Sequence, residues 1–272
     1  SGNLLEKLVC RLVPDAKQPE VTSELDERLL ATPPIALERC HVLTGEMALC
    51  AQNVFRSSAK AFGELTPDVS KAVRDGEEKT DHYEDILGTF LVKLSSQQIS
   101  QADSAEAAML LKSIGDLERI SDHSLNLLEA AEELKEKKIS FSESANKELT
   151  VLVGAVEEIV ELAFDAFLHN DLEKAYQVEP LEQVIDDLKE QLRMRHILRL
   201  QQGSCSIETG FVWSDLITNL ERVSDHCSNI AVCMIQVHDN NNFDMHGYLN
   251  DLKAASNEEF TNKFKAYSEK YM

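Results

Sequence analysis

The sequence predicts an all-α protein made of two tandem antiparallel three-helix bundles. Gly and Pro are scarce, at 10 and 6 of 272 residues. Long helices need few such turn residues, whereas a sheet of many short strands needs many. Hydrophobic residues make up 43% of the chain, which is enough for a packed core. A seven-residue string recurs with one substitution, which indicates that one helical unit is present in two copies.

Six stretches with helical spacing of apolar residues define the elements. In the first half they run over about 35–64, 69–96 and 103–138, and the first follows Pro33 and Pro34, which suit a helix start. In the second half they run over about 142–168, 171–201 and 207–238. The chain therefore divides into a lead-in at 1–36, a first repeat at 37–140, a second repeat at 141–240, and a tail at 241–272 with room for a short helix.

An internal duplication is visible in the third helix of each half. Residues Leu117–His123 read LERISDH, and Leu220–His226 read LERVSDH, so that six of the seven positions are identical. Asn126 and Asn229 follow at the same distance. Chance similarity between two helices does not give such a match, and three helices per copy with short loops predict two bundles in sequence.

The composition excludes several classes of partner and function. A net charge of -21 repels phosphate backbones and anionic lipid, so no nucleic-acid partner is expected. The electrostatic field of so acidic a chain attracts cations, although a need for solubility is enough to explain the net charge. No stretch has the ~20 apolar residues of a membrane span. No Gly-rich phosphate loop and no G-x-S-x-G motif is present, so the enzyme classes that carry these signatures are not expected.

Acidic pairs at i, i+4 lie on the second and third helices of both copies, and this spacing puts each pair on one helix face. Antiparallel neighbours can turn two such pairs toward each other, where four carboxylates repel strongly unless a cation lies between them. Divalent metals favour such all-oxygen sites, and bridging carboxylates can hold more than one ion. One predicted metal site consists of Glu77, Asp81, Glu118 and Asp122, and the other of Glu182, Asp186, Glu221 and Asp225.

These ladders continue to Asp85, Glu190, Asn126 and Asn229 at i+8. The alternative is a solvated face, because like charges at i, i+4 on an exposed helix cost only ~0.2–0.5 kcal/mol. Repetition in both copies is what favours the metal interpretation. The histidines that follow Asp, such as His123 and His226, are expected in capping or surface roles, and the basic run from Arg193 to Arg199 on a solvated face.

Residues 116–123 and their copy at 220–226 closely resemble the signature of the PhoU family. The resemblance implies two three-helix repeats whose E(D)-x-x-x-D motifs bind metal clusters, with iron or zinc the divalent ions expected first. It also implies regulation of phosphate transport or phosphate signalling, without catalysis. Ser121 and Ser224 stand where the family commonly has Gly, and Asn219 stands where the first copy has Asp116. Neither departure removes a carboxylate from the paired acids.

The lead-in carries a second resemblance. Leu25–Leu30 and Thr32–Leu37 look like the segment that joins the membrane part of Na/Pi-cotransporter-related proteins to their cytoplasmic PhoU-like domain. This implies a soluble fragment from the cytoplasmic side of the inner membrane, with the apolar start Leu4–Val13 as the stub of the membrane part. The implied partner is a phosphate-transport membrane domain or transporter. A metal-free scaffold for protein–protein interaction and a metal-dependent hydrolase are the alternatives, and a homodimer is left open.

Overall fold

The computed structural model describes residues 25–238 and 258–272, and every regular element in those residues is a helix. The predicted all-helical fold with six long helices is confirmed, and the largest error in a helix end is residue 64 against Ala61. The elements are η2 (Glu27–Ala31), α2 (Pro33–Ala61), α3 (Pro67–Ser95), α4 (Gln101–Lys137), α5 (Glu143–His169), α6 (Leu172–Gln201), α7 (Ile207–His238) and α9 (Glu258–Tyr271).

Short polar residues set where the long helices begin. The hydroxyl of Thr66 accepts a hydrogen bond from the Val69 backbone N–H at the start of α3. Ser100 and Asp103 form a reciprocal capping box at α4, which satisfies two backbone donors that the first turn leaves open. The side chains of Ser142 and Asp171 each accept one backbone hydrogen bond at the starts of α5 and α6. The starts of these helices are therefore determined by the local sequence.

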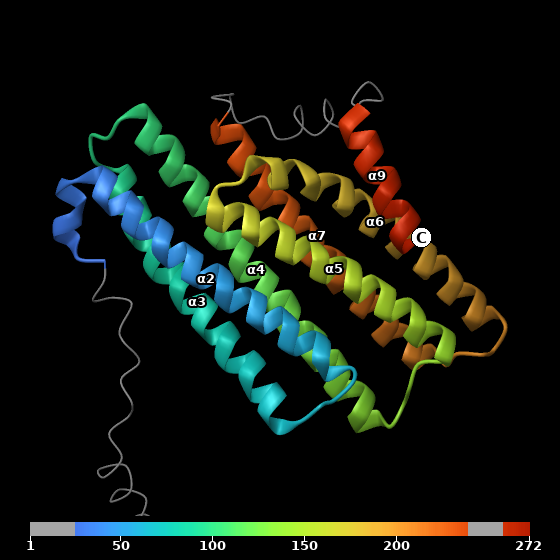
Figure 1. Ribbon diagram of the computed structural model, residues 1–272. Helices are drawn as coiled ribbons and strands as arrows, with labels where there is room; N and C mark the ends of the chain where they lie inside the picture. The colour runs from blue at the N-terminus through green and yellow to red at the C-terminus, as the bar shows by residue number, and fades with distance from the viewer. Residues whose placement is uncertain (1–24, 239–257) are drawn as a thin grey trace, which may run out of the picture.

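Two antiparallel bundles lie side by side (Figure 1). Helices α2, α3 and α4 pack together as the first bundle, and α5, α6 and α7 as the second. The bundles meet chiefly where α4 lies along α7, with a smaller contact between α2 and α5. Since α4 and α7 carry the duplicated string, each copy of that string lies at the junction between the two halves.

One hydrophobic core runs through both bundles. Phe55 of α2, Leu87 of α3, Ile120 of α4, Phe164 of α5 and Trp213 of α7 belong to the same cluster and are buried. Burial removes apolar surface from water, which is the main favourable contribution to folding. The halves therefore cohere through a shared core as well as through polar contacts.

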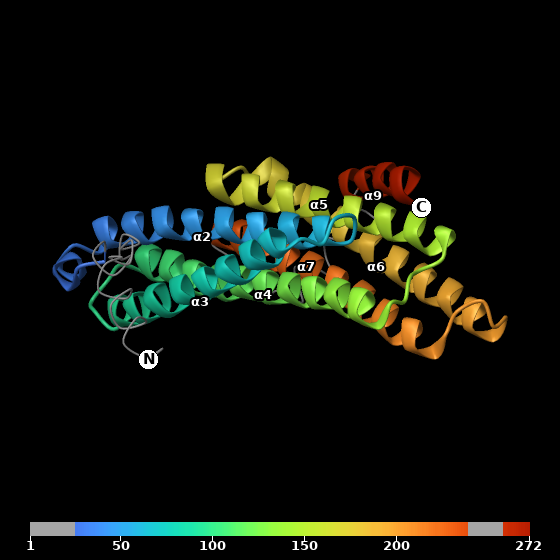
Figure 2. The same ribbon diagram turned by 90° about the horizontal axis from the view of Figure 1, so that it is seen from below.

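The last helix, α9, lies on the outside of the second bundle against α6 (Figure 2). Lys263 donates a hydrogen bond to Gln177 of α6 at 2.8 Å, and Lys270 lies 2.9 Å from Glu158 of α5. Among the described residues, none of the helices is both long and apolar enough to cross a membrane. The apolar start Leu4–Val13 and the first part of the tail lie outside the described residues.

Candidate metal centre

In the first set, Glu77 of α3 and Glu118 of α4 are half-buried, whereas Asp81 and Asp122 are exposed. Burial raises the pKa of Glu77, and the negative charges of Asp81 and Asp122 raise that pKa further. Burial likewise raises the pKa of Glu118, followed by the charge of Asp122. Asp122 belongs to α4 and Glu77 to α3, so acids of the two helices influence each other's pKa.

A fifth acid, Glu84, belongs to this group, and the sequence analysis missed it. The charge of Glu84 raises the pKa of Glu118 across the two helices. Burial and the charges of Asp85 and Asp81 raise the pKa of Glu84 itself. Glu84 lies seven residues after Glu77, which is nearly two full turns of an α-helix and keeps both on one face. The spacing of i+7 rather than i+8 was the signal that could have found it.

No ion pair joins these five acids to a Lys, Arg or His among the residues that the structure describes. The nearby Arg74 instead lies 2.7 Å from Glu132 and 3.8 Å from Glu129 on the outer side of α4. Arg74 and Arg119 lower the pKa values of Glu77 and Glu118, but burial and the neighbouring acids outweigh them. Mutual repulsion is thus only partly offset in the first set.

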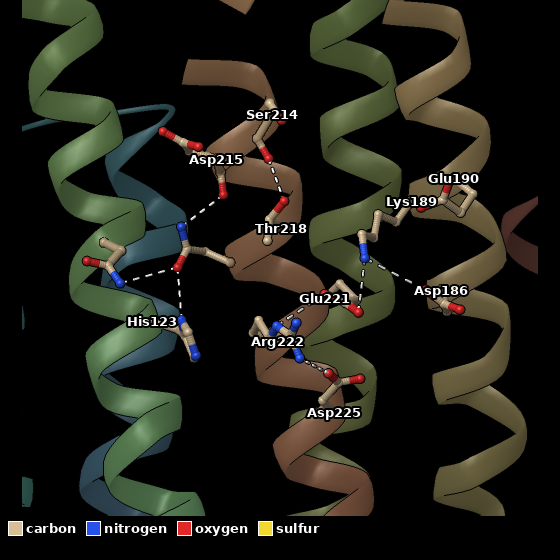
Figure 3. A network of polar contacts seen from close by, with 12 residues as sticks. His123, Asp186, Lys189, Glu190, Ser214, Asp215, Thr218, Glu221, Arg222 and Asp225 are labelled. Carbon is tan, nitrogen blue, oxygen red and sulfur yellow. Dashed lines mark hydrogen bonds and ion pairs between the residues drawn. The ribbon is translucent and has the colours of Figure 1, made fainter. Parts of the chain in front are cut away.

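The second set contains its own cation (Figure 3). The ammonium of Lys189 lies 3.0 Å from Glu221 Oε1 on α7 and 3.8 Å from Asp186 Oδ1 on α6. The side chains of Lys189 and Glu221 are only 16% and 9% exposed, so the pair is largely removed from water. Such an attraction is stronger than that of a surface pair, because less water screens it.

The remaining acids of the second set are arranged around the same pair of helices. Arg222 lies 3.0 Å from Asp225 Oδ2 and 3.9 Å from Glu221 Oε2. Burial raises the pKa of Asp225, Glu221 adds to the shift, and Arg222, His226 and Lys189 oppose it. Glu182 is half-buried on α6, one turn before Asp186.

The residues at i+8 in the predicted ladders are either exposed or lie at the junction between the two bundles. Asp85 and Glu190 are exposed. Asn126 and Asn229 lie in the junction between α4 and α7 instead of beside the acids. Asn126 donates to Asn219 Oδ1 at 3.2 Å, and Asn229 donates to Asp116 Oδ1 at 3.1 Å.

The two histidines of the duplicated string lie in the same junction, so the expected capping or surface role was wrong. His123 Nδ1 lies 2.9 Å from Asn219 Oδ1, and His226 Nδ1 lies 2.8 Å from Asp116 Oδ1. Their rings stack with centroids 5.5 Å apart. The packing of one bundle on the other places them here, and the sequence of one helix does not show which partner covers it.

The expectation of a solvated face for the basic run on α6 was wrong for two of its residues. His196 is buried and stacks on Trp213, with ring centroids 6.0 Å apart. The guanidinium of Arg199 lies over the same indole ring and 2.8 Å from Glu148 Oε2. These two side chains hold α6 to α5 and α7. Arg193 and Arg195 are exposed, as expected.

Carboxylate oxygens are suitable ligands for divalent ions, so the donor chemistry of both sets fits a metal. In the described ranges, however, no three Asp, Glu, His or Cys side chains are grouped closely enough to hold an ion as they stand. To hold an ion, the side chains would have to turn toward one another. Both sets therefore fit a metal by donor type, while their side chains as they stand are too far apart to hold one.

Comparison with known proteins agrees with this architecture. The family model described as the PhoU domain matches residues 44–131 and 149–234, which is once per bundle. The chain belongs to the PhoU family. It is 34% identical to the phosphate-specific transport system accessory protein PhoU homolog 1 of Thermotoga maritima over 128 residues, 47% of this chain and 54% of that relative. The match thus spans about half the length of that PhoU protein.

Other PhoU proteins match over more of their length. PhoU homolog 2 of Thermotoga maritima is 22% identical over 196 residues, which cover 68% of this chain and 79% of that protein. The crystal structure of PhoU from Pseudomonas aeruginosa matches with a TM-score of 0.70 at 21% identity, over 75% of this chain and 98% of that one. PhoU from Streptococcus pneumoniae gives 0.69 at 17% identity, over 79% and 100%. These structures share the fold.

Proposed function

We propose that this chain is a metal-binding regulatory domain of phosphate transport or phosphate signalling and that it catalyses no reaction. Its relatives are named as accessory proteins of the phosphate-specific transport system, and a structural neighbour as a regulatory protein of phosphate transport. The observation that carries the metal proposal is the first acid set, in which five carboxylates between α3 and α4 have no ion pair among the described residues.

A bound metal ion would supply the positive charge that these acids need. Glu77, Asp81, Glu118 and Asp122 are proposed as ligands of the first site, and Glu84 is proposed as a fifth. Glu182, Asp186, Glu221 and Asp225 are proposed for the second. Iron or zinc are the ions proposed first, with room for more than one at each site. Bound metal would also create a place for phosphate on a chain whose net charge of -21 repels it.

The partner that we propose is a phosphate-transport membrane domain or a transporter. The support is the family membership together with the lead-in, whose residues 25–37 resemble the linker of Na/Pi-cotransporter-related proteins. On this basis the chain works at the cytoplasmic side of the inner membrane. Co-purification of a tagged full-length protein with membrane fractions tests this part, and recovery in the soluble fraction alone would contradict it.

Elemental analysis of protein purified without chelator tests the metal proposal. We expect metal in the wild-type protein and much less in the variant with Glu118→Ala and Asp122→Ala. The matched control is Glu136→Ala with Glu157→Ala, which removes the same charge at two exposed positions outside both sets and should leave the metal content unchanged. Wild-type protein that contains no metal, even after incubation with iron or zinc, would contradict the proposal.

Calorimetric titration with inorganic phosphate tests whether the metal creates a phosphate site. We expect heat of binding from metal-loaded protein and none from protein treated with chelator. Equal heats from both forms would contradict the phosphate part and leave the metal part unaffected.

A metal-free scaffold for a partner protein is the second candidate function. Its support is a group of exposed apolar side chains where α6 ends and α7 begins. Met194, Ile207 and Phe211 are 67%, 73% and 69% exposed. The equivalent positions of the first repeat, at the same offsets from the duplicated acids, are Thr89, Ser104 and Ala108. The fold therefore does not require apolar residues there, and large exposed apolar patches mark interaction surfaces.

A further inference from the structure

A pocket of about 210 Å³ lies at one end of the second bundle, outside both acid sets. It is surrounded by the first turns of α5 and α7, the end of α6 and the segment 139–142 that leads into α5. These helix ends lie together at the same end of the bundle (Figure 1). The pocket is lined by apolar side chains such as Ile139 and Phe141 and by the polar side chains of His196, Arg199 and Trp213.

Three nitrogen atoms of these lining residues have no hydrogen-bond partner among the described residues. They are Trp213 Nε1, Arg199 Nη2 and His196 Nε2, and each is buried. The whole residues Trp213 and His196 are only 1% and 7% exposed. Buried polar groups in folded proteins are nearly always hydrogen-bonded, because removing them from water without a partner costs free energy. The partner of these groups must therefore come from outside the described chain.

The first repeat shows that the fold does not require polar side chains at these positions. At the same offsets from the duplicated acids, it has three leucines in place of His196, Arg199 and Trp213. They are Leu91, Leu94 and Leu110, and all of them are buried in the hydrophobic core. The second repeat thus carries three nitrogen-bearing side chains where apolar packing serves the same helices. Their presence calls for an explanation other than the fold.

The charge at the pocket favours an anion. Arg199 is the one charged residue among those that line the pocket. Its Nη1 atom lies 2.8 Å from Glu148 Oε2, and Arg195 lies 3.6 Å from the other oxygen of Glu148, so one carboxylate faces two guanidinium groups. Burial, followed by the charge of Arg199, lowers the pKa of His196, so the imidazole is uncharged at neutral pH. The N-termini of α5 and α7 add partial positive charge.

We infer that this pocket binds a small organic monocarboxylate. Arg199 Nη2 and Trp213 Nε1 donate to the carboxylate oxygens, and Ile139 and Phe141 cover a short carbon chain. Drug-sized ligands occupy pockets of about 300–1,000 Å³, so a pocket of about 210 Å³ limits the ligand to a few carbon atoms. Inorganic phosphate fits less well, because it carries more negative charge and has no apolar part. The site is separate from the acid sets and goes beyond the proposed function, on which it does not depend.

Fluorescence of Trp213, the one tryptophan of the chain, reports on the pocket directly. Titration of the full-length, metal-free protein with butyrate should give a saturable change, with half-saturation at millimolar concentration or below. Butyramide, the uncharged analogue, should bind at least about tenfold more weakly, because hydrogen bonds to a charged group are stronger. Inorganic phosphate should also bind more weakly than butyrate. Equal affinity for butyrate and butyramide, or tighter binding of phosphate, would overturn the inference.

Ligand-observed nuclear magnetic resonance of butyrate measures binding in variants, since it needs no tryptophan. Trp213→Phe keeps an aromatic ring and removes the N–H, and Arg199→Lys keeps the charge beside Glu148 but loses the forked geometry of the donors. Each should weaken binding at least about tenfold. The matched control Arg193→Lys makes the same change at an exposed position outside the pocket and should leave the affinity unchanged. Unchanged affinity in both pocket variants, or an equal loss in the control, would contradict the assigned donors.

Absence of butyrate binding at tens of millimolar would mean that the buried nitrogens are satisfied by water alone, and it would overturn the inference. Because the protein is free of metal throughout, none of these results bears on the proposed metal sites. Circular dichroism melting identifies a variant that does not fold. The comparison of butyrate with butyramide, which uses wild-type protein, then decides.

Discussion

Asp116 and Asn219 occupy equivalent positions in the two repeats and play the same role across the junction. Asp116 Oδ1 accepts from His226 and Asn229, and Asn219 Oδ1 lies within hydrogen-bonding distance of His123 and Asn126. Since both oxygens are acceptors, each histidine carries its hydrogen on Nδ1. The duplicated string therefore holds the two halves together by reciprocal contacts between its own copies.

This symmetry predicts different effects for two substitutions of Asp116. Asp116→Ala leaves the buried donors of His226 and Asn229 without their acceptor and should lower the free energy of unfolding by ~1–3 kcal/mol. Asp116→Asn reproduces the arrangement of the second repeat and should cost less than about 1 kcal/mol. Urea unfolding followed by circular dichroism measures both. Equal losses in the two variants would contradict the assigned role of the Oδ1 atom.

The raised pKa of Glu118 predicts that the metal-free protein gains stability in mild acid. Burial and the neighbouring acids raise this pKa in the folded state above the value in the unfolded chain. The folded state then binds more protons, so stability is greatest below the unfolded pKa and is lost as pH rises through the folded pKa. Glu118→Gln should therefore stabilise metal-free protein at pH 7 and show a smaller gain on acidification. Thermal melting between pH 7 and pH 5 checks this, and a wild-type melting temperature that falls over that range in parallel with the variant would contradict it.

Spacing along one helix predicted the paired acids of both sets, because i and i+4 always share a face. It did not predict which further charged side chains lie beside each set. Lys189 and Glu84 were outside the ladders that were counted at i+8, and only the packing of α6 on α7 shows the Lys189 ammonium beside Glu221. Likewise His123 and His226 were assigned to the surface, because the contact between bundles is absent from any local pattern.

Close approach between helices depends on small residues at particular points, and Gly76 on α3 is one. A Cβ atom built there would lie 2.5 Å from Val54 Cγ2 on α2. Gly115 in the interior of α4 has nothing within 4 Å of such an atom. Gly76→Ala should therefore destabilise the protein by ~1–3 kcal/mol through overpacking, although alanine favours helix formation. Gly115→Ala should stabilise it by up to about 1 kcal/mol. Denaturant unfolding of the two single variants measures this difference, and a stabilising Gly76→Ala would contradict the packing of α2 on α3.

The helices themselves were predictable to within a few residues, because their ends depend on local chemistry. The prolines in the first turns of α2 and α3 and the hydroxyl caps of α4 and α5 can all be read from the amino-acid sequence. The order of the bundles followed from the repeat. The packing of α4 on α7 and of α9 on α6 required the structure, since neither depends on residues close in sequence.

At the scale of the whole molecule, the acid sets are part of a chain with a net charge of -21. Self-repulsion of this size destabilises a compact state, and salt reduces it because the Debye length falls to about 8 Å at 0.15 M. General screening and specific binding of a divalent ion both stabilise such a protein. They differ in where they act, because screening acts on the whole surface and binding acts on the two acid sets.

Melting at matched ionic strength separates the two effects. Sodium chloride should raise the melting temperature of wild-type protein and of the variant with Glu118→Ala and Asp122→Ala by similar amounts. Manganese chloride at one hundred times the dissociation constant of the proposed first site should add about 2.7 kcal/mol in the wild-type protein. For a domain of this size that corresponds to roughly 5–10 °C. Because the extra rise requires the paired acids of α3 and α4, it should be largely absent from the variant. An equal rise in both proteins would assign the divalent effect to general screening, and the acid sets would then be solvated faces of an acidic bundle.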